Sequence, residues 1–376
     1  MNAVYTLSSI MLPPDRRLER DFPRRAAPDD ANDPIWQHYD RRTLIYDVVH
    51  LADAGVVRLY LPRLLNLSYL LKNATFQIDV TALRPVRHKV FRRFETFDFR
   101  VGAGSPRRLR ISTDTGSEFE VPISTANPEV FRDRRVLYTL LKDEPLDWIR
   151  DWLLFHSKMH GADAVLIADN GSTRYSSAQL LHAVQAVPGY LTASVLSVPL
   201  PWGPRGHAPG VDDGKYLQTM LLNLTRDRFF AAARGVLNLD VDELLLRRGQ
   251  SSVFDRVQRW GLVTFPGEWR YPVEAGQAIC HEHHRFRDPT DKPCPPKYCF
   301  RPSSRLGRMC LSVHGLERLN RKLFSGKRDF MFLHCRNIST SWKYDRTKTA
   351  KSAMVLDRET DEALSAVFAT SSMTAQ

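Results

Sequence analysis

The chain has 376 residues, of which 43% are hydrophobic and 26% charged, and this composition excludes a disordered, collagenous or disulfide-scaffold protein. Lysine and arginine total 54 against 42 acidic residues, so the formal charge of +12 favours acidic partners. Nucleic acid, an anionic membrane and phosphate-bearing small molecules all fit that charge. The sequence holds no run of about 18 apolar residues, which argues against a membrane-spanning helix.

The N-terminal region, residues 1–35, is rich in proline, arginine and aspartate, which predicts a loosely ordered arm. No charge precedes Asp15, whereas a secretory signal needs a basic start, an apolar run and a cleavage site. We therefore expect a cytoplasmic protein. The five cysteines are an odd number in a long chain, which argues against an oxidised framework.

Residues 36–135 predict an antiparallel β-rich accessory domain. Apolar side chains alternate along three short segments, as expected of strands with one buried face: 76–82, 97–101 and 119–123. Turn-forming residues at 102–106 and 114–116 separate these segments. Such a domain serves either as an acceptor-binding or assembly module, or as a packing platform for the domain that follows.

From residue 136 the pattern changes to strands alternating with helices, which predicts a mostly parallel α/β sheet over residues 136–345. Asp143, Glu144 and Pro145 follow the first strand and predict a helix start. We expect strands at 136–141, 164–168, 192–198 and 235–239, and helices around 146–159, 179–187 and 215–229. The polar tail, residues 346–376, is expected to be a terminal helix or disordered.

Acidic residues follow three of the expected strands, at 142–144, 169–170 and 240–243. Sites in parallel α/β sheets lie at the carboxyl ends of the strands, so these acids are expected at one edge. Asp240 and Asp242 should lie side by side, because residues i and i+2 share a face of an extended chain. Two carboxylates at that spacing suit Mg²⁺ or Mn²⁺, which also bind phosphate oxygens.

An ordered series of short motifs in this region resembles the catalytic core of GT-A glycosyltransferases. The motifs are Leu-Lys-Asp-Glu at 141–144, Trp148 with Trp152 and His156, Ile-Ala-Asp-Asn-Gly-Ser at 167–172, Gln218, and Leu-Asn-Leu-Asp-Val-Asp-Glu-Leu-Leu at 237–245. Arg285, Lys297 with Arg301, His314, and His334 with Arg336 and Ser339 follow in the same order. The sequence is most similar to the family 2-like and family 92-like (DUF23 type) branch.

The resemblance implies a GT-A fold and the transfer of a sugar from a nucleotide-sugar donor to a saccharide or lipid-linked acceptor. The arginine-rich composition and the absence of a secretory signal favour a role in bacterial surface or exopolysaccharide assembly. The resemblance also implies roles for single residues. Glu144 and Asp169 would hold the nucleoside of the donor, with Asn170 and Gln218 nearby. Asp240 and Asp242 would hold Mn²⁺ or Mg²⁺ on the donor diphosphate.

His334 would complete the shell of that metal, and His314 would line the donor or acceptor site. The sequence departs from the family pattern after His334. Cys335 stands where an aromatic residue is usual, and Ile338 stands where a lysine is expected before Ser339. Because of these two departures, the phosphate contacts that the family makes in this loop do not carry over directly to this sequence.

The chemistry of glycosyl transfer agrees with these residue types. Negative charge develops on the departing diphosphate, and a divalent cation with nearby basic groups stabilises it. The basic candidates are Lys142, Lys215, Arg285 and Lys297, each with an ordinary solvated surface position as the alternative. An inverting reaction needs a carboxylate base, for which Glu268 is preferred over Glu282. A retaining reaction would not need that base, so the stereochemistry stays open.

Two other classes of protein compete with this interpretation. The first is a basic, zinc-containing nucleic-acid-binding protein, with ligands from Cys280, His281, His283, His284, Cys294, Cys299 and Cys310. Only Cys280 and His283 form a compact pair, however, and reduced cysteines are the simpler account. The second is a non-catalytic carbohydrate-binding relative.

Paired arginines at 16–17, 24–25, 92–93 and 107–108 lack interleaved aromatic residues, so we expect no nucleic-acid partner. Most of these arginines are expected on solvated faces. A few would suit peripheral contact with an anionic membrane, which would place the enzyme at its inner face.

Overall fold

The computed structural model describes residues 2–22, 34–204, 214–272, 279–340, 342 and 354–368, and the chain forms two compact units. The first unit comprises Met1–Tyr5, Glu129–Ser197 and Phe230–Gln376, and the second comprises Thr6–Pro128 and Val198–Phe229. Within the described ranges, no helix has both the length and the apolar character needed to cross a membrane.

The first unit is built on a mixed sheet with nine strands in the described part of the chain, ordered β1-β15-β14-β13-β16-β20-β18-β23-β17. Four neighbouring strands run parallel: β15 (Thr192–Ser197), β14 (Ala164–Asp169), β13 (Arg135–Leu141) and β16 (Gly235–Asn238). The remaining strands of the sheet are β1 (Ala3–Thr6), β17 (Glu243–Arg247), β18 (Leu262–Arg270), β20 (Cys294–Phe300) and β23 (Phe330–Cys335). The α/β class expected from the alternating pattern is therefore confirmed.

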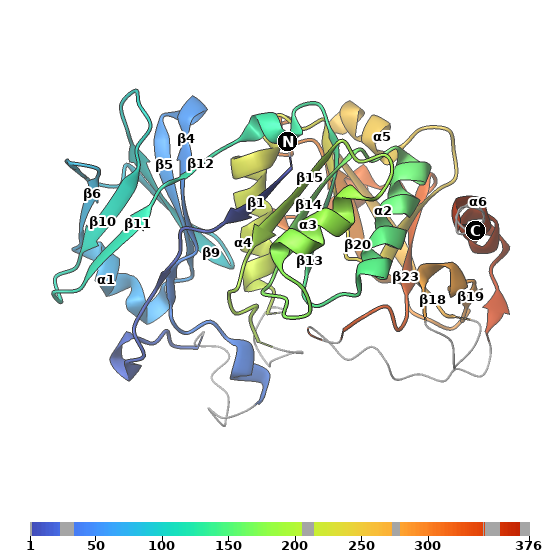
Figure 1. Cartoon of the computed structure of the whole chain (residues 1–376), viewed down its shortest axis with the longest axis horizontal. Helices are drawn as coiled ribbons and strands as arrows, with labels where there is room; N and C mark the ends of the chain where they lie inside the picture. Colours follow the sequence, from blue (N-terminus) through green and yellow to red (C-terminus); the bar gives the residue numbers. More distant parts are fainter. Residues whose placement is uncertain are drawn as a thin grey trace. The chain divides into compact units, whose positions relative to one another are not determined.

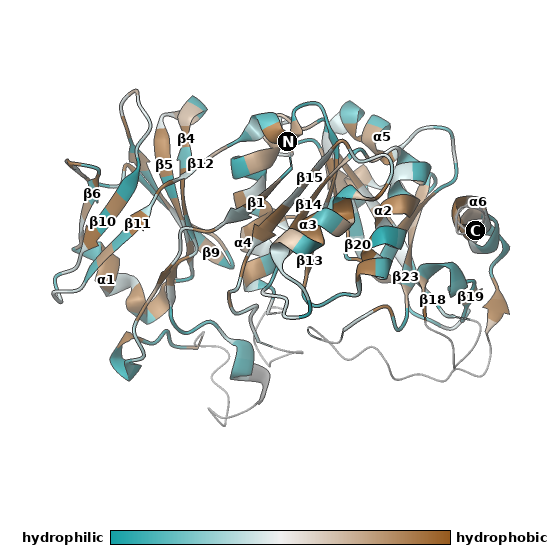
Figure 2. Ribbon diagram, in the orientation of Figure 1, coloured by the Kyte–Doolittle hydropathy of each residue, from teal (hydrophilic) through white to brown (hydrophobic). Residues whose placement is uncertain are grey.

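Helices α2 (Leu146–His160), α3 (Ser177–Gln185) and α5 (Val253–Trp260) pack against this sheet (Figure 1). The apolar stripe of α2 is buried, with Trp152 and Phe155 in the same core as Leu137 and Ile167 of the strands. Strands β13 and β14 are largely hydrophobic along their length (Figure 2), because both faces of a parallel sheet are covered.

The chain after residue 353 also belongs to the first unit. Helix α6 (Arg358–Phe368) buries Leu364 and Val367 in the core, and Lys158 of α2 donates to the carbonyl of Val367. Short strand pairs complete the unit: β19 (Phe286–Arg287) with β24 (Val355–Leu356), and β21 (Leu311–Ser312) with β22 (Gly315–Leu316). The described part of the polar tail is thus ordered, and its helical alternative is confirmed.

The second unit holds the expected antiparallel β domain. One sheet is ordered β11-β10-β6-β7, from β6 (Thr75–Ile78), β7 (Thr81–Leu83), β10 (Arg108–Ser112) and β11 (Glu118–Pro122). The other is ordered β12-β4-β5-β9-β8, from β4 (Asp47–Leu51), β5 (Val56–Pro62), β8 (Arg87–Val90), β9 (Phe94–Arg100) and β12 (Ser124–Thr125). Strands β2 (Ile10–Met11) and β3 (Thr43–Ile45) and helices α1 (Ser68–Lys72) and α4 (Tyr216–Thr225) complete it.

The boundaries of the two units differ from the sequence expectation. Residues 198–229 were expected inside the α/β domain but cluster with the β unit, where α4 packs against β5 and β9 and ion pairs add to the contact. Arg228 donates to Asp47 at 2.9 Å, and Asp227 accepts from Arg58 at 2.9 Å. The N-terminal arm is also partly ordered, since β1 lies at the edge of the large sheet.

Two local expectations are wrong in detail. The alternating segment 76–82 is a hairpin, in which Asp79 turns the chain with φ of +51° and Val80 is 89% exposed. The acidic residues before α2 do not cap it, since Pro145 occupies the N-cap position. Asp143 instead accepts hydrogen bonds from the backbone N–H groups of Thr173 and Arg174.

Two buried histidines of α2 are held neutral by their hydrogen bonds. His156 donates from Nδ1 to the carbonyl of Trp152 and accepts the N–H of Leu245 at Nε2. His160 donates from Nε2 to the carbonyl of Leu245 and accepts the N–H of Val253 at Nδ1. Burial lowers the pKa of His156 to about 3 and that of His160 to about 4.

These histidines should make the fold sensitive to acid. Below about pH 6.5 the unfolded chain binds protons that the folded chain refuses, so the free energy of unfolding falls as pH decreases toward 4. Each histidine contributes a slope of up to about 1.4 kcal/mol per pH unit. His160→Gln should reduce the slope of the free energy of unfolding against pH by up to about 1.4 kcal/mol per pH unit, as measured by urea unfolding at several pH values. The matched change at the exposed His182 should leave it unaltered, and an equal slope in His160→Gln and the parent would contradict the assignment.

Candidate active site

The acidic residues 240–243 form a turn between β16 and β17. The N–H of Glu243 donates to the carbonyl of Asp240 at 3.1 Å, and the N–H of Asp240 donates to Glu243 Oε2 at 2.9 Å. The expectation that Asp240 and Asp242 share one face of an extended strand is therefore wrong, because β16 ends at Asn238. The turn sends the two carboxylates to different partners, Lys297 and His334.

Asp242, Glu243 and His334 form a compact group of possible metal ligands. Their ligand atoms all lie within 4.8 Å of one another, and Asp242 Oδ2 is 3.0 Å from His334 Nε2. The antiparallel pairing of β17 with β23 places Glu243 opposite His334. The sequence pattern does not single out Glu243 as a ligand, although its position directly after the Asp-x-Asp motif was the available signal.

Lys297 neutralises part of this buried acidity. Its Nζ lies 2.6 Å from Asp240 Oδ2 and 2.8 Å from Glu243 Oε2, and the residue is only 1% exposed. Burial alone would lower the pKa of Lys297, but the carboxylates of Asp240 and Glu243 raise it. Burial raises the pKa of Glu243, while Lys297 acts in the opposite direction. The cluster holds three carboxylates and one ammonium group, which pairs with two of them, so it keeps a formal negative charge when His334 is neutral.

An aromatic side chain holds the imidazole of His334 in place. The rings of Trp269 and His334 stack with centroids 4.0 Å apart and planes 17° apart, and the parallel pairing of β18 with β23 sets this contact. The guanidinium of Arg336 lies 3.7 Å from the centre of the Trp269 ring. Trp269 is a site residue that the motifs do not reveal, since its partner in register is distant in sequence.

Glu268, the expected base, lies outside this cluster. It pairs with Leu333 in β23, whereas its neighbour Trp269 pairs with His334. Successive side chains of a strand point to opposite faces, so Glu268 faces away from the imidazole. Its carboxylate accepts a hydrogen bond from Arg270 at 3.2 Å and borders a small cavity of about 100 Å³.

The expected nucleoside-binding residues lie together at the ends of β13 and β14. Asp169 pairs with Leu141 and accepts hydrogen bonds from the N–H and hydroxyl groups of Ser172. Burial raises the pKa of Asp169, and the bonds from Ser172 oppose that shift. Thr340 donates to Glu144 Oε1 at 3.2 Å and to the carbonyl of Lys142 at 3.0 Å. The chain that follows His334 therefore reaches this corner of the sheet.

The other residues expected to bind the donor lie at several separate places in the fold. Asn170 donates its N–H to the carbonyl of Leu141, so it stays at the end of β14. His314 bonds the carbonyl of Pro296, directly before Lys297. Arg285 pairs with Asp361 and Ser365 of α6. Lys215 and Gln218 belong to the second unit, at and within the start of α4.

The two departures from the family pattern are both buried. Cys335 and Ile338 are each 1% exposed and belong to the hydrophobic core of the first unit. Neither side chain is therefore placed to contact a phosphate. The polar side chains of this loop that could contact a phosphate belong to Arg336, Asn337, Ser339 and Thr340.

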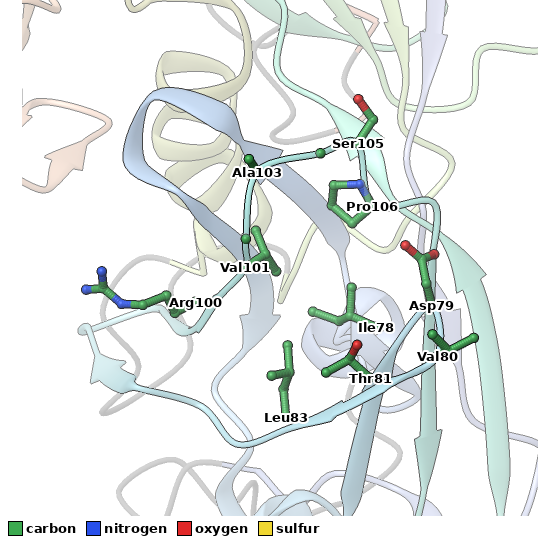
Figure 3. A pocket seen from close by; sticks show the side chains of 12 residues that line it. Ile78, Asp79, Val80, Thr81, Leu83, Arg100, Val101, Ala103, Ser105 and Pro106 are labelled. Carbon is green, nitrogen blue, oxygen red and sulfur yellow. The ribbon is translucent and has the colours of Figure 1, made fainter.

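The second unit has a hollow of about 310 Å³ between the β6–β7 hairpin and the loop at 101–106 (Figure 3). Its labelled side chains are mainly apolar, and Arg100 points away from them (Figure 3). The carboxylate of Asp79 accepts the backbone N–H groups of Arg107 and Arg108, so it stabilises the turn. This hollow lacks the converging charges that mark the edge of the large sheet.

The positions of the cysteines give little support to the alternative of a zinc-containing nucleic-acid-binding protein. No disulfide joins the five cysteines, all of which lie in described ranges. Cys294 and Cys299 are buried in β20, whereas Cys280 lies beside His283. The arginines at 17 and 108 pair with Asp15 and Glu120. Arg24 and Arg25 lie outside the described residues.

Comparison of the chain with models of known protein families and with curated proteins gives no match. The site is therefore interpreted from its own geometry, which joins buried carboxylates, an imidazole and an ammonium group at the ends of parallel strands.

Removing the charge of Lys297 should destabilise this cluster. Lys297→Met leaves Asp240 and Glu243 buried without their cation, and the free energy of unfolding should fall by about 3–5 kcal/mol at pH 7. The loss should be smaller at pH 5, where Glu243 can take up a proton. Lys292→Met, at an exposed position, is the matched control in urea unfolding. If Lys297→Met lowers the free energy of unfolding by less than about 1 kcal/mol, the ion pairs of Lys297 with Asp240 and Glu243 behave like solvated surface pairs and the assignment is wrong.

Proposed function

We propose that the chain is a metal-dependent glycosyltransferase of the GT-A type, which moves a sugar from a nucleotide-sugar donor to a saccharide or lipid-linked acceptor. The observation that carries the proposal is the group formed by Asp242, Glu243 and His334 at the carboxyl end of the parallel strands. Sites in open α/β sheets gather at that edge.

The donor set suits a divalent cation. Two carboxylates and an imidazole within 4.8 Å can bind Mn²⁺ or Mg²⁺ and leave other positions for phosphate oxygens and water. Asp242, Glu243 and His334 would hold the ion. Asp240 would lie next to it, since it hydrogen-bonds Glu243 and pairs with Lys297. When bound, the ion supplies positive charge for the diphosphate that leaves during transfer.

The rest of the edge supports a nucleotide site. Glu144 and Asp169 offer acceptors for ribose hydroxyls or base N–H groups at the ends of the two neighbouring strands. The ammonium group of Lys297 has three N–H donors, and two of them point to Asp240 and Glu243. The third could donate to a phosphate oxygen. The main contribution of Lys297 would be to keep both acids ionised and in position.

Two parts of the chain are proposed to act on the acceptor, namely Glu268 and the β unit. Glu268 would act as the base of an inverting reaction only if an acceptor reached the opposite side of β18 from His334. The β unit would bind the acceptor or serve in assembly. We propose a role in bacterial surface or exopolysaccharide assembly at the cytoplasmic side of a membrane, where the net positive charge favours peripheral contact with anionic lipid.

Nucleotide and metal binding can be tested by thermal shift with UDP, GDP and CDP, each with and without Mn²⁺. One diphosphate should stabilise the parent protein by about 2.7 kcal/mol at roughly one hundred times its Kd, and only when Mn²⁺ is present. Asp242→Asn should abolish this gain, because it removes a charged ligand. Asp53→Asn, at an exposed position of the β unit, should retain it.

A second measurement separates catalysis from binding. The parent should hydrolyse the matching nucleotide sugar slowly when Mn²⁺ is added, and Asp242→Asn should not. If no diphosphate binds the parent with metal, the proposal fails. Binding without hydrolysis or transfer would instead indicate a non-catalytic carbohydrate-binding protein.

A further inference from the structure

A second group of metal ligands lies on the segment that follows residue 279, separate from the acidic turn. Cys280, Glu282 and His283 bring a thiol, a carboxylate and an imidazole together on and beside a short 3-10 helix, His281–His283. Cys280 Sγ lies 3.5 Å from His283 Nε2 and 3.6 Å from Glu282 Oε1. The third separation, from His283 Nε2 to Glu282 Oε1, is 3.7 Å.

We propose that Cys280, Glu282 and His283 bind a zinc ion. The centre of a triangle with these three sides lies about 2.1 Å from each corner. Zinc is bound at about 2.3 Å by sulfur and at about 2.0–2.2 Å by nitrogen and oxygen. An ion placed slightly above the triangle therefore meets all three atoms at bonding distance.

The surroundings of the three ligands favour an ion that keeps an open coordination position. Their side chains are partly exposed, and Cys280 and Glu282 line a cavity of about 500 Å³ together with Asp147 and Asp151. Arg150 and Arg285 also line the cavity and offset part of its acidic charge, but they pair with Asp147 and Asp361 rather than with the three ligands. Three protein ligands with a fourth position facing a cavity is the arrangement of zinc sites that bind water or substrate.

The chemistry of the ligands separates this site from the acidic turn. A thiolate is a soft ligand that selects zinc or related ions over Mg²⁺ and Mn²⁺. The group at Asp242, Glu243 and His334 lacks sulfur and suits the harder ions. The zinc site therefore stands whether or not the proposed glycosyl transfer is correct.

The segment that carries the zinc ligands also contacts the acidic turn. His281, which is fully buried, hydrogen-bonds the carbonyl of Val241 through Nε2 at 2.8 Å, and Val241 lies between Asp240 and Asp242. Trp148 of α2 donates to the carbonyl of Ile279 on the other side. A zinc ion on residues 280, 282 and 283 would fix the backbone on both sides of His281, and so hold the turn.

Cobalt titration of the full-length protein gives a direct test, since Co²⁺ replaces zinc and absorbs through a thiolate bond. The metal-free parent should bind one Co²⁺ with a sulfur-to-cobalt charge-transfer band, and added Zn²⁺ should remove that band. Cys280→Ser and His283→Ala should each lose it. Cys310→Ser, the matched change at another half-buried cysteine, should keep it, and so should Asp242→Asn.

The outcomes are distinguishable from those for the nucleotide site. Loss of nucleotide binding in Asp242→Asn with the cobalt band retained supports two separate metal sites. A parent without the band, or a band that persists in Cys280→Ser, overturns the zinc proposal. Circular dichroism of each variant checks folding. In the Asp242→Asn background, where the acidic site is disabled, Zn²⁺ should raise the melting temperature, and adding Cys280→Ser should abolish that rise.

Discussion

The ion pair of Lys297 with Asp240 and Glu243 is the interaction on which the edge of the large sheet depends. Isolated carboxylates do not remain ionised in a protein interior, because the loss of hydration is too costly. One ammonium group shared at 2.6 and 2.8 Å permits two acids to stay charged there. The turn at 240–243 closes through hydrogen bonds of the same residues, so its shape and its charge are set together.

The sheet topology supplies the parts of this interaction from distant segments. Strand β20 brings Lys297 beside the turn, and β23 brings His334 opposite Glu243. Strand β18 then places Trp269 against the imidazole. Each contact is fixed by strand register, and a slip of one residue would turn each side chain to the other face of the sheet. Strand register therefore sets the positions of Lys297, His334 and Trp269 in the cluster.

Sequence periodicity and strand-end chemistry predict a large part of this arrangement. The buried runs at 136–141 and 164–168 become β13 and β14, because both faces of these strands are covered and local hydrophobicity decides the outcome. The gathering of acids at one edge also follows from sequence, since parallel neighbours end together.

The remaining features depend on partners that local patterns do not specify. The sequence offers Lys297 as a basic candidate and residue 243 as one of the strand-end acids. The closure of the turn by Glu243 and the pairing of Lys297 with that carboxylate are seen only in the fold. Residues 198–229 join the β unit through the packing of α4 on β5 and β9 and through the ion pair of Arg228 with Asp47, all of which connect segments distant in sequence. A buried ion pair of this kind leaves no periodic signal.

The backbone connects the two groups of metal ligands. His281 sits between Cys280 and the pair Glu282 and His283, and its imidazole bonds the carbonyl at the centre of the acidic turn. Further along, His284 bonds the carbonyl of Arg336, whose guanidinium lies on Trp269. The segment at 280–284 therefore contacts the surroundings of His334 in two places. One is the acidic turn, through Val241, and the other is the aromatic stack, through Arg336 and Trp269. Any ion that fixes residues 280–283 would therefore stabilise the geometry of the acidic cluster without touching it.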